Sequence, residues 1–418
     1  MTKSTEAAAE TEASEAPRRL PRRNFLQLGA VGSVLAVAAC STGQAPTAQT
    51  SASPASPVAS PTLTTPPKPT PIPGDKRTFY NNNPFLEESK LSEVRSLLTP
   101  NDQFFVRWHA VQAQVSATDY KLSIEGKVSN KVSFSLADLK RMPSQSVIAV
   151  IECAGNGRGY FPADPKVSGT GWHYGAASCA EWTGVSVKTL LDQAGLDPAV
   201  TQIVFVGGDQ LGVTRGLPRL KALDPDTIIA YTQNGDPVRP ENGFPARLLV
   251  PRWVGVANIK APVRMIAIAD ESELDPTIKR SLDAYTTAQY VYSGPAYPDK
   301  PQAVYQTVKA AIAHPGPDES VTAGNYAIQG YAWSGTGSIA KVEVSVDDGA
   351  YQPAVLGPQL QHGWAPFSFV WKAAAGAHSI RARATDSAGN TQPTPEQVKY
   401  NALGYGYNGT VPVKVTVT

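Results

Sequence analysis

Ser146-Val-Ile-Ala-Val-Ile-Glu152, followed at once by Cys153-Ala-Gly-Asn-Gly-Arg158, is the stretch of sequence that decides the fold. Its first half is an apolar run of the kind that forms a buried strand, and Ala-Gly-Asn-Gly is strong turn-forming sequence. The pattern therefore predicts a thiol at the end of a strand, where a rigid scaffold meets open space. A thiolate in that position is a soft metal ligand or a nucleophile, and the alternative is a buried structural cysteine.

The motif Cys153-Ala-Gly-Asn-x-Arg158 resembles the molybdenum-ligand motif of the sulfite oxidase family of molybdopterin enzymes. The resemblance runs from residue 104 to residue 260, in the order of the family and close to its spacing. The matching segments are Phe104-Phe-Val-Arg107-Trp-His109, Gly171-Trp172, Gly175-Ala-Ala-Ser178, Trp182, Phe205-Val-Gly-Gly-Asp209, Asn242-Gly-Phe-Pro-Ala-Arg247-Leu-Leu-Val-Pro251 and Gly255-Val-Ala-Asn-Ile-Lys260. Further segments resemble the dimerisation domain of the same family, namely Gly330–Gly335, Val342–Gly349 and Ala384–Pro393.

The expected architecture follows from the pattern and from the resemblance together. FSLADLKRM and VSVKTLLDQAGL have helical spacing, whereas SVIAVIE, QIVFVGG and ARLLVPRW are typical of buried strands. The resemblance implies an α+β sulfite-oxidase-type molybdopterin-binding domain over residues 75–300. Residues 301–418 contain alternating strands such as KVEVSVDD, HSIRARAT and VPVKVTV, separated by turn residues. That pattern predicts an all-β immunoglobulin-like sandwich.

The N-terminal part of the chain predicts export. Residues 1–40 contain Arg22-Arg23 in a twin-arginine pattern, followed by an apolar stretch that ends in Val37-Ala-Ala-Cys40. That ending resembles a bacterial lipobox, so we expect lipidation at Cys40 and a periplasmic or other extracytoplasmic membrane face; the alternative is ordinary cleavage nearby. Residues 41–74 are rich in Ser, Thr, Ala and Pro and almost uncharged, which favours a disordered spacer.

Charge, hydrophobicity and cysteine content bear on the partners of the chain, on membrane spanning and on disulfide pairing. Lys plus Arg number 37 and Asp plus Glu number 35, so the composition does not favour nucleic acid as a partner. Beyond the N-terminal segment, no apolar run reaches membrane-spanning length. The three cysteines are Cys40, Cys153 and Cys179. We expect Cys179 to be a buried packing thiol and do not expect it to pair with Cys153.

The resemblance implies a set of cofactor-binding residues. Cys153 would supply the one protein thiolate to a molybdenum held otherwise by the dithiolene of a single pterin. Arg247 and Lys260 would bind the pterin phosphate, and the alternative is a pair of solvated cations. Asp209 would accept hydrogen bonds from the pterin, or else stabilise the turn after Gly207-Gly208.

Four more positions belong to the implied cofactor site. Phe105, Arg107 and His109 come from the first matching segment, and His109 would face the pterin. Asn242 departs from the animal and plant members of the family, which have histidine there. Because an asparagine amide can still donate to phosphate, this departure changes one contact and leaves cofactor binding intact.

The resemblance also implies a substrate pocket. Arg107 and Arg158 match the arginines of the family's anion pocket, and Trp172 matches its aromatic wall. Tyr285 is the expected active-site tyrosine, with Tyr290 as the alternative. A third arginine of typical members falls at Leu403, which predicts weaker anion affinity or a different substrate.

The predicted function is therefore molybdenum-dependent oxidation of sulfite to sulfate, with electrons passing to a separate protein. We expect that acceptor to be a c-type cytochrome, since the sequence carries no haem or flavin motif, and we expect a homodimer. The alternatives are an exported reductase of sulfoxides or nitrate, or a sulfane dehydrogenase, on the same fold. From a different class, a non-enzymatic binding lipoprotein remains open.

Overall fold

The computed structural model describes residues 77–82, 85–109, 111–209, 211–317 and 319–418. The twin-arginine motif, Cys40 and the predicted spacer at 41–74 lie outside these residues. None of the helices within the described ranges is both long and apolar enough to cross a bilayer.

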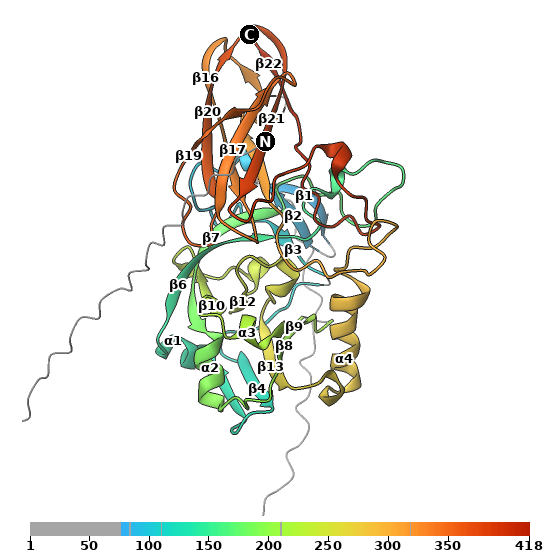
Figure 1. Ribbon diagram of the computed structural model, residues 1–418. Coiled ribbons are helices and arrows are strands. Elements are labelled where there is room, and N and C mark those ends of the chain that lie inside the picture. The colour runs from blue at the N-terminus through green and yellow to red at the C-terminus, as the bar shows by residue number, and fades with distance from the viewer. Residues whose placement is uncertain (1–76, 83–84, 110, 210, 318) are drawn as a thin grey trace, which may run out of the picture. The chain divides into compact units, whose positions relative to one another are not determined.

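The predicted cysteine strand is β6, Gln145–Glu152, at the edge of a five-stranded sheet (Figure 1). The sheet order is β11-β10-β7-β6, and β12 pairs with β10. All pairs in it are antiparallel. Its other strands are β7 Ala177–Ser186, β10 Ile228–Gln233, β11 Asp236–Pro237 and β12 Arg247–Leu249. The ARLLVPRW segment thus forms a shorter strand than its apolar run suggests, because a turn begins at Pro251.

A second five-stranded sheet has the order β5-β4-β13-β8-β9. It is mixed, since β13 runs parallel to β4 and antiparallel to β8. Its strands are β4 Lys121–Gly126, β5 Val132–Ser135, β8 Gln202–Gly207, β9 Thr214–Pro218 and β13 Pro262–Ile268. A smaller antiparallel sheet contains β1 Arg77–Asn82, β2 Phe85–Ser89 and β3 Val106–Arg107.

The helices of this region are short, and side chains cap the N-termini of α1, α2 and α4. Ser135 and Asp138 form a capping box at α1, and Ser186 caps α2. The α-helices are α1 Leu136–Arg141, α2 Val187–Ala194, α3 Arg219–Ala222 and α4 Pro276–Asp283. One turn of π-helix, η6 Ala284–Ala288, continues α4. The two segments with helical spacing therefore form helices, and the α+β prediction is confirmed.

The C-terminal region is a sandwich of two sheets around its own apolar core. One sheet has the order β14-β16-β20-β19, and the other has the order β15-β22-β21-β17-β18. The first contains β14 Lys309–His314, β16 Gly324–Trp333, β19 Val355–Leu356 and β20 Ala365–Ala373. The second contains β15 Ser320–Val321, β17 Ile339–Val346, β18 Gln352–Pro353, β21 Gly376–Asp386 and β22 Val413–Val417. The predicted sandwich is therefore confirmed, and KVEVSVDD, HSIRARAT and VPVKVTV lie in three adjacent strands.

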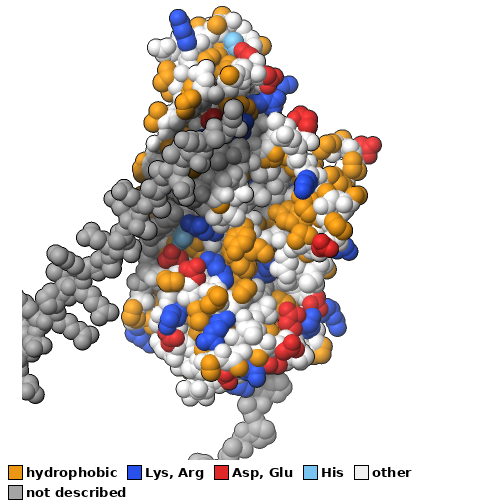
Figure 2. All heavy atoms as spheres, in the orientation of Figure 1, with side chains coloured by type: hydrophobic (Ala, Val, Ile, Leu, Met, Phe, Trp, Pro, Cys, Tyr) orange, Lys and Arg blue, Asp and Glu red, His pale blue; other side chains and the backbone are white. Residues whose placement is uncertain are grey.

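On the face shown in Figure 2, basic and acidic side chains are interspersed rather than separated into fields of one sign. This distribution agrees with the near balance of 37 basic and 35 acidic residues. Long-range electrostatic attraction of a polyanion requires a concentrated patch of one sign, which this face does not present.

Candidate active site

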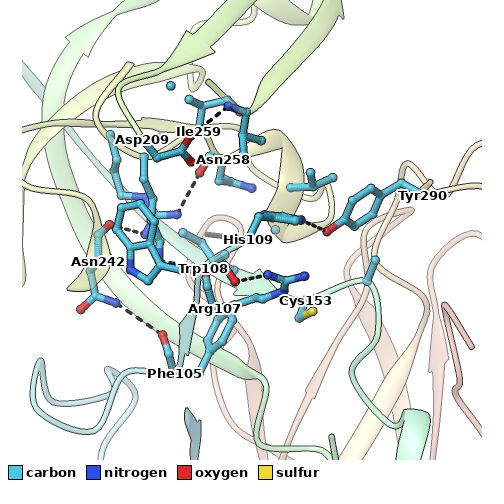
Figure 3. Close-up of a pocket in the computed structure, with 18 of the residues that line it drawn as sticks. Phe105, Arg107, Trp108, His109, Cys153, Asp209, Asn242, Asn258, Ile259 and Tyr290 are labelled. Carbon is cyan, nitrogen blue, oxygen red and sulfur yellow. Dashed lines mark hydrogen bonds between the residues drawn. The ribbon is translucent and has the colours of Figure 1, made fainter. Parts of the chain in front are cut away.

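Five of the segments that resemble the family, at residues 104–109, 153–158, 205–209, 242–251 and 255–260, line one pocket, which holds about 680 Å³ of space with its open mouth included. Its wall includes eight of the predicted cofactor residues, namely Phe105, Arg107, His109, Cys153, Asp209, Asn242, Arg247 and Lys260. In Figure 3 the Cys153 sulfur and the Tyr290–His109 pair lie on one side of the pocket, opposite Asn242.

Cys153 reaches the pocket because it begins the turn after β6. Its N–H donates to the Ala176 carbonyl at 2.9 Å, and its carbonyl accepts from Asn156 N–H at 2.9 Å. The Asn156 side chain closes the turn, since its Oδ1 accepts from Ala176 N–H at 3.0 Å. The side chain of Cys153 is 8% exposed and packs in an apolar cluster with Ile151 and Trp172. The thiol is therefore held in a defined position by backbone and asparagine hydrogen bonds.

Arg247 and Lys260 are thirteen positions apart in the chain, but they pair across a β-bridge. Arg247 is 3% exposed, and burial lowers its pKa to about 9. Burial also lowers the pKa of Lys260 well below its usual range, and the neighbouring charges of Arg247 and Arg107 add to this effect. Lys260 Nζ donates to the carbonyls of Arg107 and Glu241 at 3.0 and 2.8 Å. Positive charges that lie together in a pocket shielded from water repel one another, and an anionic ligand would offset that repulsion.

The Arg247 guanidinium has spare hydrogen-bonding capacity. It donates from Nη1 to the Asn242 carbonyl at 2.9 Å and from Nη2 to the Asn258 carbonyl at 3.2 Å. Its Nε is buried without a hydrogen-bond partner among the described residues, and so is Asn242 Oδ1. Unsatisfied buried polar atoms of this kind are rare in folded proteins and often mark a ligand or an ion. The unpaired donor, the cations and the thiol therefore fit a cofactor that brings both a phosphate and a soft metal.

Asp209 stabilises a turn, which is one of the two roles that its sequence context left open, and it also lies on the pocket wall. Its Oδ1 accepts from Val213 N–H at 3.1 Å, which stabilises the loop between β8 and β9. The same side chain lines the pocket, and burial raises the pKa of its carboxyl. A partly desolvated carboxylate beside the loop N–H groups can accept further hydrogen bonds from a ligand.

Both candidate tyrosines contact His109. Tyr290 lines the pocket, and its hydroxyl lies 2.5 Å from His109 Nε2. Its backbone has a φ of 56°, a left-handed conformation that is uncommon for a bulky residue and concentrates at functional sites. Tyr285 lies in η6, packs edge-on against the His109 ring at 4.9 Å and does not line the pocket. Burial lowers the pKa of His109, as do the charges of Arg107 and Lys260, so the imidazole is neutral and can accept from the Tyr290 hydroxyl.

Arg107, Arg158 and Trp172, the predicted substrate residues, occupy different positions relative to the pocket. Arg107 lines it, and its Nη1 donates to the Trp108 carbonyl. Trp172 is 1% exposed and lies in the apolar cluster around Cys153, behind the wall. Arg158 is also buried and is absent from the wall.

The Arg158 side chain lies in a slot lined by three glycines, Gly155, Gly169 and Gly404. A Cβ on Gly155 would come within 2.5 Å of its Nη2, and a Cβ on Gly404 within 2.8 Å of its Cγ. Its Nε donates to the Leu403 carbonyl at 3.0 Å, and its Nη1 donates to the Thr170 carbonyl at 3.1 Å. Its guanidinium lies over the Tyr405 ring, which in turn stacks on Tyr290. Arg158 therefore supports the tyrosine part of the wall from behind.

Arg215 lies near the pocket but outside the sequence segments that resemble the family. It is 1% exposed on β9, and its Nη1 donates to the Tyr285 carbonyl. Its Nε and Nη2 have no hydrogen-bond partner, and no ion pair involves it within the described ranges. Burial lowers its pKa to about 10. The available signal was an arginine shortly after the Asp209 loop, two positions beyond the pocket residue Val213.

Cys179 lies in a different environment from Cys153. It is 1% exposed, burial raises its pKa to about 12, and its neighbours are aromatic side chains such as Trp364. Both cysteines are free thiols. The expectation of a buried packing thiol at position 179 is confirmed.

Comparison with known proteins agrees with this site. Residues 109–275 match the family described as "Oxidoreductase molybdopterin binding domain", and residues 301–418 match "Mo-co oxidoreductase dimerisation domain". The chain is 32% identical over 382 residues to the mitochondrial sulfite oxidase of Drosophila melanogaster, covering 82% of this chain and 63% of that protein. It is 32% identical over 335 residues to the sulfite oxidase of Gallus gallus, covering 73% of this chain and 70% of that protein.

A solved structure is similar over most of the chain. The crystal structure of the sulfane dehydrogenase SoxCD from Paracoccus pantotrophus matches with a TM-score of 0.73 and 27% identity, over 83% of this chain and 90% of that one. With these relatives, both domain matches and a pocket that fits the cofactor, the chain belongs to the sulfite oxidase family of molybdopterin-dependent oxidoreductases.

Proposed function

We propose that this protein oxidises sulfite to sulfate and passes the electrons to a separate acceptor protein. The main support for this proposal is that the thiol of Cys153 lines the same pocket as Arg107, Arg247 and Lys260. When bound, the molybdenum centre supplies the two-electron redox chemistry. The residues of the chain would bind the cofactor, orient the substrate and exclude water.

The roles divide between the two sides of the pocket. Arg247, Lys260 and Asn242 would hold the phosphate of the cofactor, while Asp209, His109 and Phe105 would contact the pterin. Cys153 would supply the protein ligand to the metal. Arg107 and Tyr290 lie on the side where Cys153 opens into the pocket, so they would contact the substrate, with Trp172, Arg158 and Tyr285 behind them.

Steady-state kinetics with sulfite and an external one-electron acceptor test this function. Arg107→Gln should raise the KM for sulfite about tenfold or more, because it removes a charge-assisted contact of roughly 1.5–3 kcal/mol. Arg219→Gln is the matched control, since Arg219 also donates to backbone carbonyls but lies at the start of α3 and not on the pocket wall. An unchanged KM for sulfite in Arg107→Gln, with the cofactor bound, would exclude sulfite as the substrate.

A sulfane dehydrogenase is the second candidate, and two observations favour it. The guanidinium of Arg158 donates hydrogen bonds to the Leu403 and Thr170 carbonyls. In addition, Leu403 occupies the position at which typical members of the family have a third arginine. The first feature leaves fewer Arg158 N–H groups for a small oxyanion, and the second removes one positive charge. If a sulfane-bearing substrate has a higher kcat/KM than sulfite, and Leu403→Arg reverses that order, this second function replaces the first.

We also propose export by the twin-arginine route, with anchoring at Cys40 and a spacer over residues 41–74. A single acyl signal gives weak membrane binding unless more than one chain is attached, as in a bacterial lipoprotein. The protein should partition with membranes, and Cys40→Ser should release it in active form. Release of the unaltered protein without a detergent would contradict the anchor.

The electron acceptor would be a c-type cytochrome on the same side of the membrane. Reduction of such a cytochrome by the purified enzyme tests this.

A further inference from the structure

Within its own sheet the cysteine strand β6 pairs with β7 on one side, and no described strand of that sheet lies along its other edge. A free edge leaves backbone groups available for pairing with other segments. Segments from beyond residue 300 supply these partners. The His362 N–H donates to the Ile148 carbonyl at 3.0 Å, and the Val150 N–H donates to the His362 carbonyl at 3.0 Å. Gln306 Nε2 donates to the Val150 carbonyl at 2.9 Å.

The two faces of β6 contact different parts of the protein. Val147, Ala149 and Ile151 pack in the apolar cluster that contains Cys153. Ile148 and Val150 pack in a second cluster with side chains of the C-terminal sandwich. Because side chains alternate along a strand, Glu152 lies on the same face as Ile148 and Val150. The carboxylate next to the thiol therefore points towards the sandwich.

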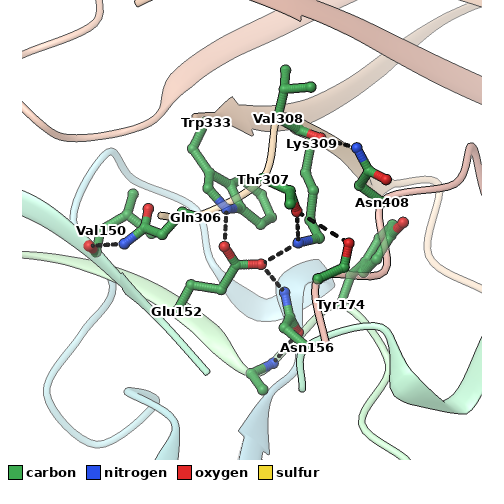
Figure 4. A network of polar contacts seen from close by, with 12 residues as sticks. Val150, Glu152, Asn156, Tyr174, Gln306, Thr307, Val308, Lys309, Trp333 and Asn408 are labelled. Atoms are coloured by element: carbon green, nitrogen blue, oxygen red, sulfur yellow. Dashed lines mark hydrogen bonds and ion pairs between the residues drawn. The ribbon is translucent and has the colours of Figure 1, made fainter. Parts of the chain in front are cut away.

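Glu152 forms a buried ion pair with the sandwich, as Figure 4 shows. Its Oε1 lies 2.6 Å from Lys309 Nζ, and each side chain is only 2% exposed. Its Oε2 accepts from the Trp333 indole N–H at 3.0 Å. Lys309 Nζ also donates to Thr307 Oγ1 at 2.7 Å. Both charges of the pair are thus hydrogen-bonded as well as paired.

The same carboxylate holds the turn that carries the thiol. Glu152 Oε1 accepts from Asn156 Nδ2 at 3.0 Å, and Asn156 closes the turn of Cys153 through Ala176. On the other side, the Gly406 N–H donates to the Ala154 carbonyl at 2.8 Å. Contacts from beyond residue 300 therefore reach both ends of the cysteine turn.

We propose that Lys309 and Trp333 are positioning residues for the Cys153 thiol, so that the sandwich takes part in cofactor binding as well as in dimerisation. Two buried charges often stabilise a fold less than apolar residues of the same size would, and some such pairs instead fix a unique geometry. Here the ion pair fixes Glu152, Glu152 fixes Asn156, and Asn156 fixes the turn that aims the thiol at the pocket. The proposal rests on Cys153 as the metal ligand, but it requires no particular substrate.

The test uses the full-length chain in two forms, free of cofactor and loaded. In the cofactor-free form, the alkylation rate of Cys153 by iodoacetamide is followed by peptide mass, which separates it from Cys40 and Cys179. Lys309→Met should raise that rate about tenfold, which corresponds to a local opening that costs about 1.4 kcal/mol less.

In the loaded form of Lys309→Met, the molybdenum content per pterin should fall by roughly half or more, because the thiolate contributes to metal binding. The EPR signal of the pentavalent metal should broaden or shift, because the thiolate also contributes to the electronic environment of the metal.

Rescue separates positioning from a general loss of structure. Lys309→Met leaves Glu152 as an unpaired buried charge, whereas Lys309→Met combined with Glu152→Gln removes both charges. The double variant should recover most of the lost protection of Cys153 and most of the molybdenum content. Lys341→Met is the matched control, since it breaks an ion pair with Glu343 on the exposed surface of the sandwich and should change neither readout.

Two outcomes would overturn the proposal. One is that Lys309→Met behaves like Lys341→Met in the alkylation rate, the molybdenum content and the EPR signal. The other is a double variant that is as defective as the single one. If Lys309→Met does not fold, Trp333→Phe replaces it, since this change removes the N–H donor to Glu152 and keeps an aromatic ring, although a smaller one, at this buried position. An unchanged EPR signal in that variant would be equally decisive. If sulfite is not oxidised but these readouts respond, the proposed substrate fails and the positioning role stands.

Discussion

Cys153 is 8% exposed at the wall of the pocket, whereas Cys179 is 1% exposed and surrounded by aromatic side chains. We predict that Cys153→Ser abolishes activity in a folded protein that still contains the pterin. A hydroxyl is a poor ligand for a soft metal, but Arg247, Lys260 and Asp209 would still bind the organic part of the cofactor. Activity, molybdenum and pterin content are measured on the same preparation, with Cys179→Ser as the control. Activity above a few per cent of the unaltered enzyme would remove Cys153 from the ligand role.

Arg215 is a buried guanidinium that lacks an acidic partner among the described residues and donates to the carbonyl of Tyr285. Removing an unpaired buried charge is favourable, whereas leaving that carbonyl unsatisfied is unfavourable by about 1–3 kcal/mol. We therefore predict that Arg215→Met changes thermal stability little but lowers kcat/KM about tenfold, because η6 and its tyrosine are no longer fixed. Thermal unfolding and steady-state kinetics check this, with Arg219→Met as the matched control. Full activity in Arg215→Met would show that η6 does not depend on this contact.

At the scale of elements, the π-helical turn η6 and the residues after it place two tyrosines against one histidine. Single π-helical turns occur frequently at functional sites. We predict that Tyr290→Phe lowers kcat more than Tyr285→Phe, because only the Tyr290 hydroxyl both lines the pocket and bonds His109. The kcat and KM of the two phenylalanine variants, compared side by side, decide between the residues. A larger loss of kcat in Tyr285→Phe would show that Tyr285, the tyrosine expected from the sequence, is the active-site residue.

The loop after β21 is held by Asp386, which accepts from the hydroxyls of Ser334 and Thr336 at 2.7 Å each. Burial alone would raise the pKa of Asp386, but hydrogen bonds from Thr336, Asn390 and Ser334 outweigh it and lower the pKa from 3.8 to about 2. A folded-state pKa below the unfolded value gives stability that is present above about pH 4 and is lost as the pH falls towards 2.

We therefore predict that Asp386→Asn lowers the free energy of unfolding of the sandwich by about 2 kcal/mol at pH 7, and by much less at pH 2. Urea unfolding of the full chain at the two pH values measures the difference. Asp348→Asn is the control, since the Asp348 side chain is 74% exposed. An equal loss at both pH values would mean that the charge of Asp386 is not the source of its stabilising effect.

At the scale of the whole molecule, the match of residues 301–418 to a dimerisation domain supports a homodimer. Val355 and Val370 lie on one sheet of the sandwich and are 72% and 70% exposed in the single chain. Exposed apolar side chains on a sheet face favour a partner, and twofold closure is the commonest arrangement. We predict a light-scattering mass of two chains at micromolar concentration, and a shift towards one chain in Val370→Lys. A single-chain mass for the loaded, unaltered enzyme would contradict the dimer.

The sequence by itself determined the cysteine strand, the turn after it, the helices α1 and α2 and the strands of the sandwich. These features depend on hydrophobic periodicity, capping and turn residues, all of which act over a few neighbouring positions. The ordered motifs from residue 104 to residue 260 were also sufficient to identify the family and the cofactor.

Only the tertiary structure decided which way the long side chains point and what they meet. It placed Arg158 in a slot behind the wall, Tyr290 on the wall with Tyr285 behind it, and Arg215 beneath η6. It also joined Glu152 to Lys309, which is 157 positions further along the chain. No local pattern encodes such contacts, because the direction of a flexible side chain and the identity of its distant neighbours depend on how the whole chain packs.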